Sequence, residues 1–171
     1  MNADFDIIYF DMDSVLADFE KGVRELCGME PSTQDSPDRD ERDGIMFERI
    51  SRIPNFYLKL DPIQGTLDIL KELRSRYGGR IEILTGVPKP HRNVPTAASD
   101  KMLWVRKYIG DGITVHTVLR REKMEYAKGP GSILIDDLRM NIDEWTAAGG
   151  TGILFTCPDD LRMKLSEMGI L

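Results

Sequence analysis

The chain has 171 residues, of which 41% are apolar, so it is long enough for one globular domain with a core and is not expected to be disordered. Its net charge of −6 argues against broad, non-specific nucleic-acid binding, and no apolar run approaches the length that spans a bilayer. The N-terminus does not resemble a signal peptide, and Cys27 and Cys157 lack a redox or metal-ligand spacing. We therefore expect a cytoplasmic protein with no membrane association and no stable nucleic-acid partner.

Charge is unevenly distributed along the chain. Residues 1–48 carry 14 acidic and 4 basic side chains, whereas residues 89–128 carry 9 basic and 4 acidic ones. Surface charge usually serves only solubility. A positive segment in an acidic protein would also suit a small anionic substrate.

Short apolar runs alternate with helical patterns along most of the chain. In chain order we predict a strand at 7–10, helical stretches at 15–27 and 44–53, a helix at 62–77, a strand at 81–84, a helix at 99–109, strands at 113–118 and 133–135, a helix at 142–148, a strand at 152–155 and a helix at 158–168. Apolar strands covered on both faces are typical of parallel sheets. The alternation predicts an α/β fold with a Rossmann-like, doubly wound parallel sheet.

About fifty residues between the first strand and Pro62 break this alternation. They contain two helical stretches separated by the polar run 31–43. We interpret this segment as a small helical cap of residues 16–60, inserted into a core domain of residues 1–15 and 61–171. The alternative is a loosely packed surface excursion, which is less expected because structureless loops of this length are uncommon.

Two aspartates, Asp11 and Asp13, follow the first strand directly. In open α/β sheets, ligands bind outside the carboxyl ends of the strands. Two neighbouring carboxylates there would repel each other unless a positive group lay between them, and Mg²⁺ is the usual cation beside a phosphate. Taken alone, such a pair is more often structural or simply solvated.

Other strand ends repeat the pattern. Thr85 and Gly86 follow the second strand, and Asp136 and Asp137 follow the fourth, with Lys123 upstream in a basic stretch. Coincidence explains any one of these features, but it poorly explains four in order.

These residues resemble the four sequence motifs of the haloacid dehalogenase (HAD) superfamily, and more narrowly the 5′(3′)-deoxyribonucleotidases. The segments that carry the narrower resemblance are 11–20, 56–63, 104–110, 119–123, 134–137 and 153–157. Two positions depart from the nucleotidase pattern: Ser14 stands where Gly is usual, and Gly86 stands where Ser is common.

The resemblance implies a role for each motif residue. Asp11 would form an aspartyl-phosphate, and Asp13 would act as general acid and base while its backbone carbonyl ligates Mg²⁺. Thr85 and Lys123 would bind the transferring phosphoryl group. Lys128 competes with Lys123 for that role, but Lys123 matches the family segment.

The resemblance also implies metal ligands and substrate contacts. Asp136 and Asp137 would join Asp11 and Asp13 at the metal, and which of Asp136 and Asp137 ligates directly stays open. Phe19 matches a position that contacts the base, with core packing about equally favoured.

Several further residues are open to two interpretations. The hydroxyl of Ser14 would touch phosphate or merely fit its turn, and Gly86 would border the substrate without that hydrogen bond. Arg139 and Asn141 would support the metal carboxylates or cap a helix. Lys101 also resembles a family lysine, but an exposed helix surface is the favoured interpretation.

The resemblance implies a Mg²⁺-dependent phosphatase that hydrolyses nucleoside monophosphates, with a pyrimidine deoxyribonucleotide as the favoured substrate. A homodimer is possible. One alternative is a phosphatase for another small phosphomonoester or for a nucleic-acid 3′-phosphate. Another is a non-catalytic nucleotide- or metal-binding module, which would not need both Asp11 and Asp13.

Overall fold

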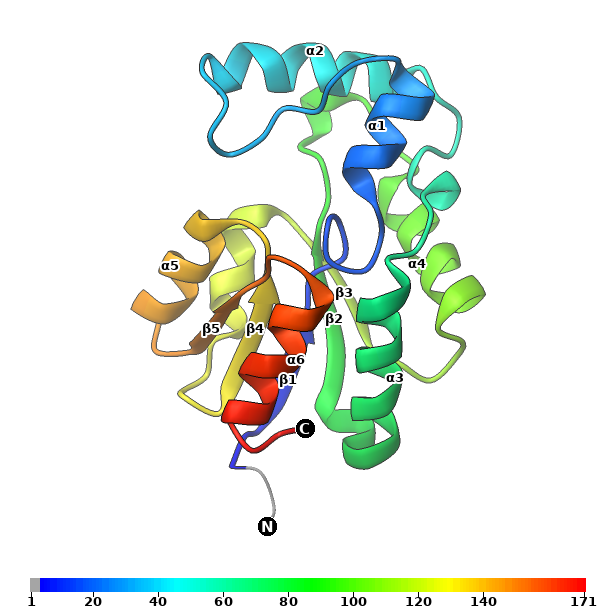
Figure 1. Cartoon of the computed structure of the whole chain (residues 1–171). Helices are drawn as coiled ribbons and strands as arrows, with labels where there is room; N and C mark the ends of the chain where they lie inside the picture. The colour runs from blue at the N-terminus through cyan, green and yellow to red at the C-terminus, as the bar shows by residue number, and fades with distance from the viewer. Residues whose placement is uncertain (1–3) are drawn as a thin grey trace.

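The computed structural model describes residues 4–171 and contains a five-stranded, all-parallel sheet in the order β3-β2-β1-β4-β5 (Figure 1). The strands are β1 (Ile7–Phe10), β2 (Ile81–Gly86), β3 (Val115–Val118), β4 (Ser132–Asp136) and β5 (Thr151–Leu154). All five predicted strands are present, with ends that differ by at most two residues. The predicted α/β fold with a doubly wound parallel sheet is confirmed.

Both faces of the sheet are buried, which explains why its central strands are mostly apolar. Ile8 and Phe10 of β1 belong to the larger hydrophobic cluster, whereas Tyr9 between them belongs to a smaller cluster around Trp145. This alternation follows from the two-residue period of a strand. The sheet therefore has a fixed register, and the ends of β1, β2 and β4 are held side by side.

Six α-helices lie within the described residues. They are α1 (Phe19–Cys27), α2 (Arg39–Ser51), α3 (Gln64–Tyr77), α4 (Ala97–Tyr108), α5 (Arg139–Ala147) and α6 (Pro158–Glu167). Buried residues of α3, α4 and α6 join the larger cluster, and α5 contributes Trp145 to the smaller one. None of the helices described is long and apolar enough to cross a membrane.

Five helix starts differ from the sequence prediction, those of α4 and α5 because each helix begins two or three residues earlier than predicted. α1 begins at Phe19 rather than at residue 15, because the Asp18 side chain accepts a hydrogen bond from the Lys21 backbone and caps the helix there. α3 begins at Gln64 rather than at Pro62, because the extended Ile63 donates its backbone N–H to Leu16. α2 begins at Arg39, inside the polar run that sequence periodicity left outside a helix.

Helices α1 and α2, together with the loop that joins them, form a layer above the carboxyl edge of the sheet (Figure 1). We call residues 19–51 the α1–α2 layer. Two chain segments connect it to the sheet, residues 12–18 and 52–63. These segments pair with each other through a bridge between Ala17 and Pro62 and a hydrogen bond of 2.8 Å from the Asp18 backbone N–H to the Asp61 carbonyl.

Trp104 of α4 fixes the second connecting segment. Its indole Nε1 donates a 2.8 Å hydrogen bond to the Leu60 carbonyl, and the side chain is completely buried. The indole therefore fills the space beneath the connection and also satisfies a backbone acceptor.

We predict that Trp104→Phe lowers the free energy of unfolding by about 2 kcal/mol, because a buried carbonyl loses its donor and a small void is left. Urea unfolding followed by circular dichroism measures this change. The matched control is Leu103→Ala on the same helix, where the side chain is 46% exposed and a change within about 0.5 kcal/mol is expected. Equal effects of the two substitutions would contradict the role of Trp104.

Candidate active site

Polar side chains converge where β1, β2 and β4 end. Asp11 directly follows β1, Thr85 lies near the end of β2, and Asp136 is the last residue of β4. Because β1 lies between β2 and β4, these three residues occupy neighbouring positions along one edge of the sheet. All three are buried, Thr85 and Asp136 completely. The sheet topology thus brings together three of the predicted site residues.

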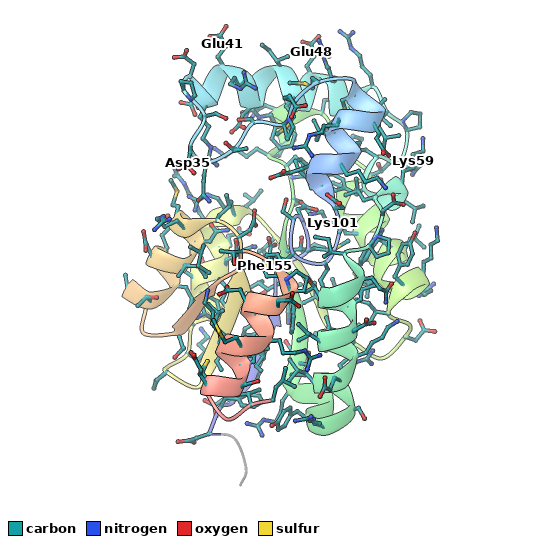
Figure 2. All side chains as sticks on the ribbon, in the orientation of Figure 1. Asp35, Glu41, Glu48, Lys59, Lys101 and Phe155 are labelled. Carbon is teal, nitrogen blue, oxygen red and sulfur yellow. The ribbon has the colours of Figure 1, made fainter. Side chains whose placement is uncertain are left out.

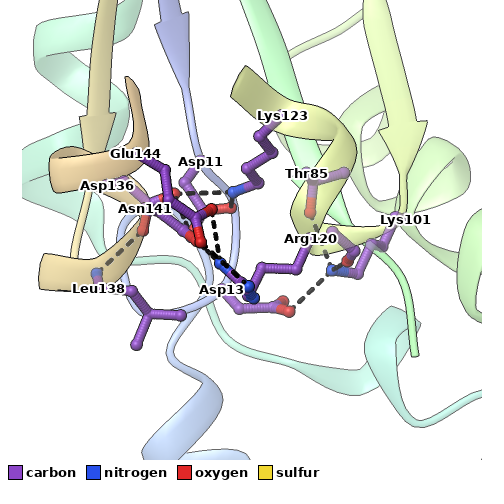
Figure 3. Close-up of polar contacts among 11 residues, drawn as sticks. Asp11, Asp13, Thr85, Lys101, Arg120, Lys123, Asp136, Leu138, Asn141 and Glu144 are labelled. Carbon is purple, nitrogen blue, oxygen red and sulfur yellow. Dashed lines mark hydrogen bonds and ion pairs between the residues drawn. The ribbon is translucent and has the colours of Figure 1, made fainter. Parts of the chain in front are cut away.

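Lys123 links two of these strand ends (Figure 3). Its ammonium group donates to Asp11 Oδ1 at 2.7 Å and to Asp136 Oδ2 at 2.8 Å. Burial alone would lower the pKa of Lys123, but the two carboxylates outweigh it and raise the pKa above its usual value. Lys123 therefore stays charged at any physiological pH. Of the two lysines considered from the sequence, Lys123 is the one at the strand ends.

Asp11, Asp136 and Asp137 place carboxylate oxygens within 4.8 Å of one another. Burial raises the pKa of Asp137 to about 9, and repulsion from Asp11 and Asp136 adds to the effect. Burial and the charge of Asp11 also raise the pKa of Asp136. One ammonium group cannot neutralise these three carboxyl groups when all of them are ionised. The oxygen-only donor set and this excess of negative charge fit a hard divalent cation.

Asp13 lies outside this carboxylate group, although the sequence prediction included it among the metal residues. Its Oδ2 accepts a 2.7 Å hydrogen bond from the Lys101 ammonium group. Its other oxygen, Oδ1, is buried and has no partner among the described residues. The predicted ligand from Asp13 was the backbone carbonyl, and that role stays a prediction. The side chain has a different environment from that of Asp11.

Lys101 is the main correction to the sequence interpretation, because it is fully buried rather than on an exposed helix surface. Besides Asp13, its ammonium group donates at 2.8 Å to Thr85 Oγ1 and at 2.8 Å to the Gly86 carbonyl. The group also lies 4.6 Å from the ring centroid of Tyr57. Lys101 thus joins the ends of β1 and β2 (Figure 3).

A signal for Lys101 was present in the sequence. Ala97, Lys101, Trp104 and Val105 have the spacing of one helix face, and the other three are buried in the core. A lysine within an apolar stripe needs a buried anionic or polar partner. The helical pattern alone therefore indicated a buried lysine, although it could not name Asp13 as the partner.

Ser14 and Gly86, the two positions that depart from the nucleotidase pattern, differ in backbone conformation and in the space around them. Ser14 has a φ of 64°, in the left-handed region that glycine adopts without steric cost, which explains why glycine suits this turn. A Cβ atom at Gly86 would meet its nearest neighbours, in Arg120, at 3.9 Å, so a Cβ would make ordinary van der Waals contact there without a clash. Neither observation tests the predicted contacts of Ser14 and Gly86 with substrate.

Phe19 begins α1, in the helical layer above the strand ends, and is partly buried. Its ring stacks against Tyr57 with an interplanar angle of 23° and a centroid distance of 6.3 Å, and it meets Phe56 edge-on. Phe56 and Tyr57 are both core residues. The role of Phe19 in binding a base stays a prediction.

A hydrogen-bond network from α5 and Arg120 supports Asp136, and the sequence indicated only one member of it, Asn141. Asn141 of α5 donates to Asp136 Oδ2 at 2.9 Å and accepts from Arg120 at 3.1 Å, and Arg120 also pairs with Glu144. Of the two interpretations of Asn141, support of a clustered carboxylate is the one observed. The sequence showed no periodic signal that would link Arg120 to Glu144.

Comparison with known proteins agrees with this geometry. A sequence model of the family described as 5′ nucleotidase, deoxy (pyrimidine), cytosolic type C protein (NT5C) matches residues 5–167. The chain belongs to this nucleotidase family. The match covers all of the strand ends that carry the site residues.

Individual relatives are more distant. The human cytosolic-type 5′(3′)-deoxyribonucleotidase is 27% identical, over 92% of this chain and 83% of its own length. The human mitochondrial 5′(3′)-deoxyribonucleotidase is 29% identical, over 76% of this chain and 61% of its own. A putative 5′(3′)-deoxyribonucleotidase of Vibrio phage KVP40 is 28% identical, over 79% and 68%. These nucleotidases are phosphoric monoester hydrolases, and membership makes this chain an enzyme of that type.

Solved structures support the fold. A hydrolase from Streptococcus pneumoniae TIGR4 aligns with a TM-score of 0.56 at 17% identity, covering 95% of this chain and 98% of the other. A HAD-superfamily hydrolase from Ehrlichia chaffeensis aligns with a TM-score of 0.53 at 13% identity, covering 95% and 96%. Both alignments support the α/β fold, and the family model confirms the resemblance to the deoxyribonucleotidases.

The raised pKa of Asp137 leads to a pH-dependent prediction for this nucleotidase-family site. Because its pKa is raised to about 9, Asp137 would release a proton when a cation binds to its carboxylate near neutral pH. We predict that the Mg²⁺ affinity rises between pH 6 and pH 8.5 by up to about tenfold per pH unit, because one proton leaves for each cation bound. Isothermal titration calorimetry in buffers of different ionisation enthalpy measures both the affinity and the proton release.

Asp137→Asn provides the control for this prediction. The amide cannot lose a proton in this range, so the variant should bind Mg²⁺ more weakly and with a flatter pH dependence. An affinity in the unsubstituted protein that is equal at pH 6 and pH 8.5 would show that Asp137 does not face the cation.

Proposed function

We propose that this protein hydrolyses nucleoside monophosphates in a Mg²⁺-dependent reaction with Asp11 as the nucleophile, and that pyrimidine deoxyribonucleotides are its substrates. The observation that carries the proposal is the separate environment of each aspartate. Asp11 lies with Lys123 and two further carboxylates, whereas Asp13 is held by Lys101. Two carboxylates two residues apart can therefore perform different tasks. The family membership and the names of the relatives support the substrate class.

In the first step Asp11 attacks phosphorus. Lys123 donates to Oδ1 of Asp11, which leaves Oδ2 as the attacking oxygen. The new bond joins this oxygen to phosphorus, and the bond from phosphorus to the nucleoside oxygen breaks. Mg²⁺ held by Asp11, Asp136 and Asp137, with the predicted Asp13 carbonyl, would supply positive charge beside the phosphoryl oxygens. Lys123, Lys101 and Thr85 would stabilise the negative charge that develops on those oxygens.

Asp13 completes the proton transfers. Its buried Oδ1, which has no partner among the described residues, would deliver a proton to the departing nucleoside oxygen. The resulting carboxylate would then take a proton from the water that attacks the aspartyl-phosphate. Phosphate leaves, and Asp11 is regenerated. Lys101 orients Asp13 throughout, since it holds the Oδ2 atom.

The α1–α2 layer would act as the cap, with residues 16–60 as the cap segment and residues 1–15 and 61–171 as the core. It lies above the strand ends, and Phe19 at its base could stack on a nucleobase. Residues 1–3 of the proposed core lie outside the described residues. The same resemblance that implies Mg²⁺ implies this base contact.

The first test measures phosphate release from a panel of monophosphates with Mg²⁺, beside Asp11→Asn and an EDTA control. The panel holds dUMP, dTMP, their 3′ isomers, ribonucleotides, sugar phosphates and a 3′-phosphorylated oligonucleotide. We expect turnover of the deoxyribonucleotides that Asp11→Asn reduces at least about 10³-fold, because the covalent route is lost.

The other outcomes separate the substrate from the mechanism. Turnover of sugar phosphates or of the oligonucleotide, with the same dependence on Asp11, would keep the chemistry and replace the substrate. Nucleotide binding without any hydrolysis would replace the enzyme with a binding module.

A second prediction concerns Lys101. Lys101→Met keeps the side-chain length but removes the ammonium group from Asp13, Thr85 and Gly86. We expect kcat to fall by about 10²–10³-fold, as when one charge-stabilising donor is removed from an active site. The control is Lys107→Met on the exposed side of the same helix, which should leave kcat unchanged. An unaltered kcat in a folded Lys101→Met protein would assign Lys101 a structural role only.

A further inference from the structure

Gln34, in the loop between α1 and α2, contacts the loop that carries Asp137. Its amide Nε2 donates to the Asp137 carbonyl at 3.2 Å, and its Oε1 accepts from the Arg139 backbone N–H at 2.9 Å. The two bonds use both ends of one side-chain amide and span more than one hundred residues of chain. These hydrogen bonds hold the backbone on both sides of Leu138, at the Asp137 carbonyl and at the Arg139 N–H.

Hydrogen bonds within the loop around Gln34 stabilise the conformation that makes this contact. The Thr33 backbone N–H donates to Ser36 Oγ at 2.9 Å, the two hydroxyls lie 3.1 Å apart, and the Ser36 N–H donates to the Thr33 carbonyl. These bonds form a tight turn with Gln34 and Asp35 at its tip. In Figure 2 the label of Asp35 marks where this turn approaches the part of the core around α5.

The loop that is hydrogen-bonded to Gln34, residues 137–139, is part of the acidic site. Asp136 and Asp137 each offer an oxygen to the carboxylate group, and the Leu138 N–H donates to Asp136 Oδ1 at 2.9 Å. Asp137 therefore contributes two groups. Its side chain is one of the clustered carboxylates, and its backbone carbonyl accepts the hydrogen bond from Gln34. A shift of this backbone would move the carboxylate of Asp137 relative to Asp11.

We propose that Gln34 is a positioning residue that couples closure of the α1–α2 layer to cation binding at Asp11, Asp136 and Asp137. This inference rests on the proposed function for the identity of the cation as Mg²⁺. The Gln34 bonds exist only while the layer lies against the core, and they hold the backbone of Asp137 in the arrangement seen. Closure therefore favours cation binding. By linkage, cation binding must favour closure by the same factor.

Two substitutions test the coupling. Gln34→Ala removes the amide, and Gln34→Met removes both hydrogen bonds while it keeps the volume. The matched control is Gln64→Ala, because Gln64 makes a surface hydrogen bond to Asp68 at the start of α3. Isothermal titration calorimetry of each metal-free protein with MgCl₂, in the absence of nucleotide, gives the Mg²⁺ affinity.

We expect both Gln34 variants to bind Mg²⁺ about tenfold more weakly, at the low end of the effect seen when residues that support metal ligands are removed. Gln64→Ala should bind as the unsubstituted protein does. Thermal unfolding without Mg²⁺ checks that the variants are folded. A Mg²⁺ affinity within twofold of the unsubstituted value in both Gln34 variants would overturn the proposal.

Hydrogen exchange supplies the reciprocal measurement. Mg²⁺ should slow amide exchange in residues 31–38 of the unsubstituted protein several-fold, and it should have no such effect in Gln34→Ala. Equal protection in both proteins would show that the layer responds to the cation without Gln34, and would also overturn the inference.

The nucleotide panel tests the proposed function, and the Mg²⁺ titration tests the role of Gln34 independently of it. Normal Mg²⁺ affinity in the Gln34 variants, beside nucleotide hydrolysis that requires Asp11, would remove this inference alone. A clear effect of Gln34 on Mg²⁺ binding in a protein that hydrolyses no nucleotide would remove the proposed substrate and keep the coupling.

Discussion

The buried ammonium group of Lys123, shared between Asp11 and Asp136, is the interaction on which the site depends. A buried carboxylate is costly without a partner, and an ion pair that loses one member leaves an uncompensated charge. The parallel pairing of β1 with β4 brings the two aspartates together, and Lys123 makes this arrangement tolerable. Asn141 and the Leu138 N–H occupy further lone pairs of Asp136. The negative charge still exceeds the positive charge, which is why the same edge suits a divalent cation.

A second ammonium group, that of Lys101, offsets the electrostatic repulsion between Asp11 and Asp13. The sequence predicts a cation beside two repelling aspartates, and the structure in addition pairs each aspartate with a lysine of its own. Lys101 pairs with Asp13 and reaches back to Thr85, and Lys123 pairs with Asp11. This separation lets two chemically identical side chains differ in electrostatic environment at a distance of only two residues.

The strand ends could be predicted from the sequence because strand periodicity and parallel topology determine which residues share an edge. Asp11, Thr85 and Asp136 follow from that rule alone. The prediction for Lys101 was wrong because lysine on a helix is usually exposed, whereas Lys101 lies within the apolar stripe of α4. Gln34 could not be found, since it lies in an aperiodic loop and its partners are backbone groups. Residue identity says nothing about which main-chain atoms a distant amide will meet.

The α1–α2 layer touches the site at two different places. The connecting segment 12–18 contains Asp13, and the Met12 carbonyl in it accepts backbone hydrogen bonds from Leu16 and Ala17 at 2.9 Å. The Gln34 turn, far from it in the sequence, meets the backbone of Asp137. One place therefore adjoins the aspartate paired with Lys101, and the other adjoins the carboxylate group beside Lys123. The segment that contains Asp13 leads directly into α1, and the Gln34 turn joins α1 to α2. We therefore expect a displacement of the α1–α2 layer to alter the two halves of the site together.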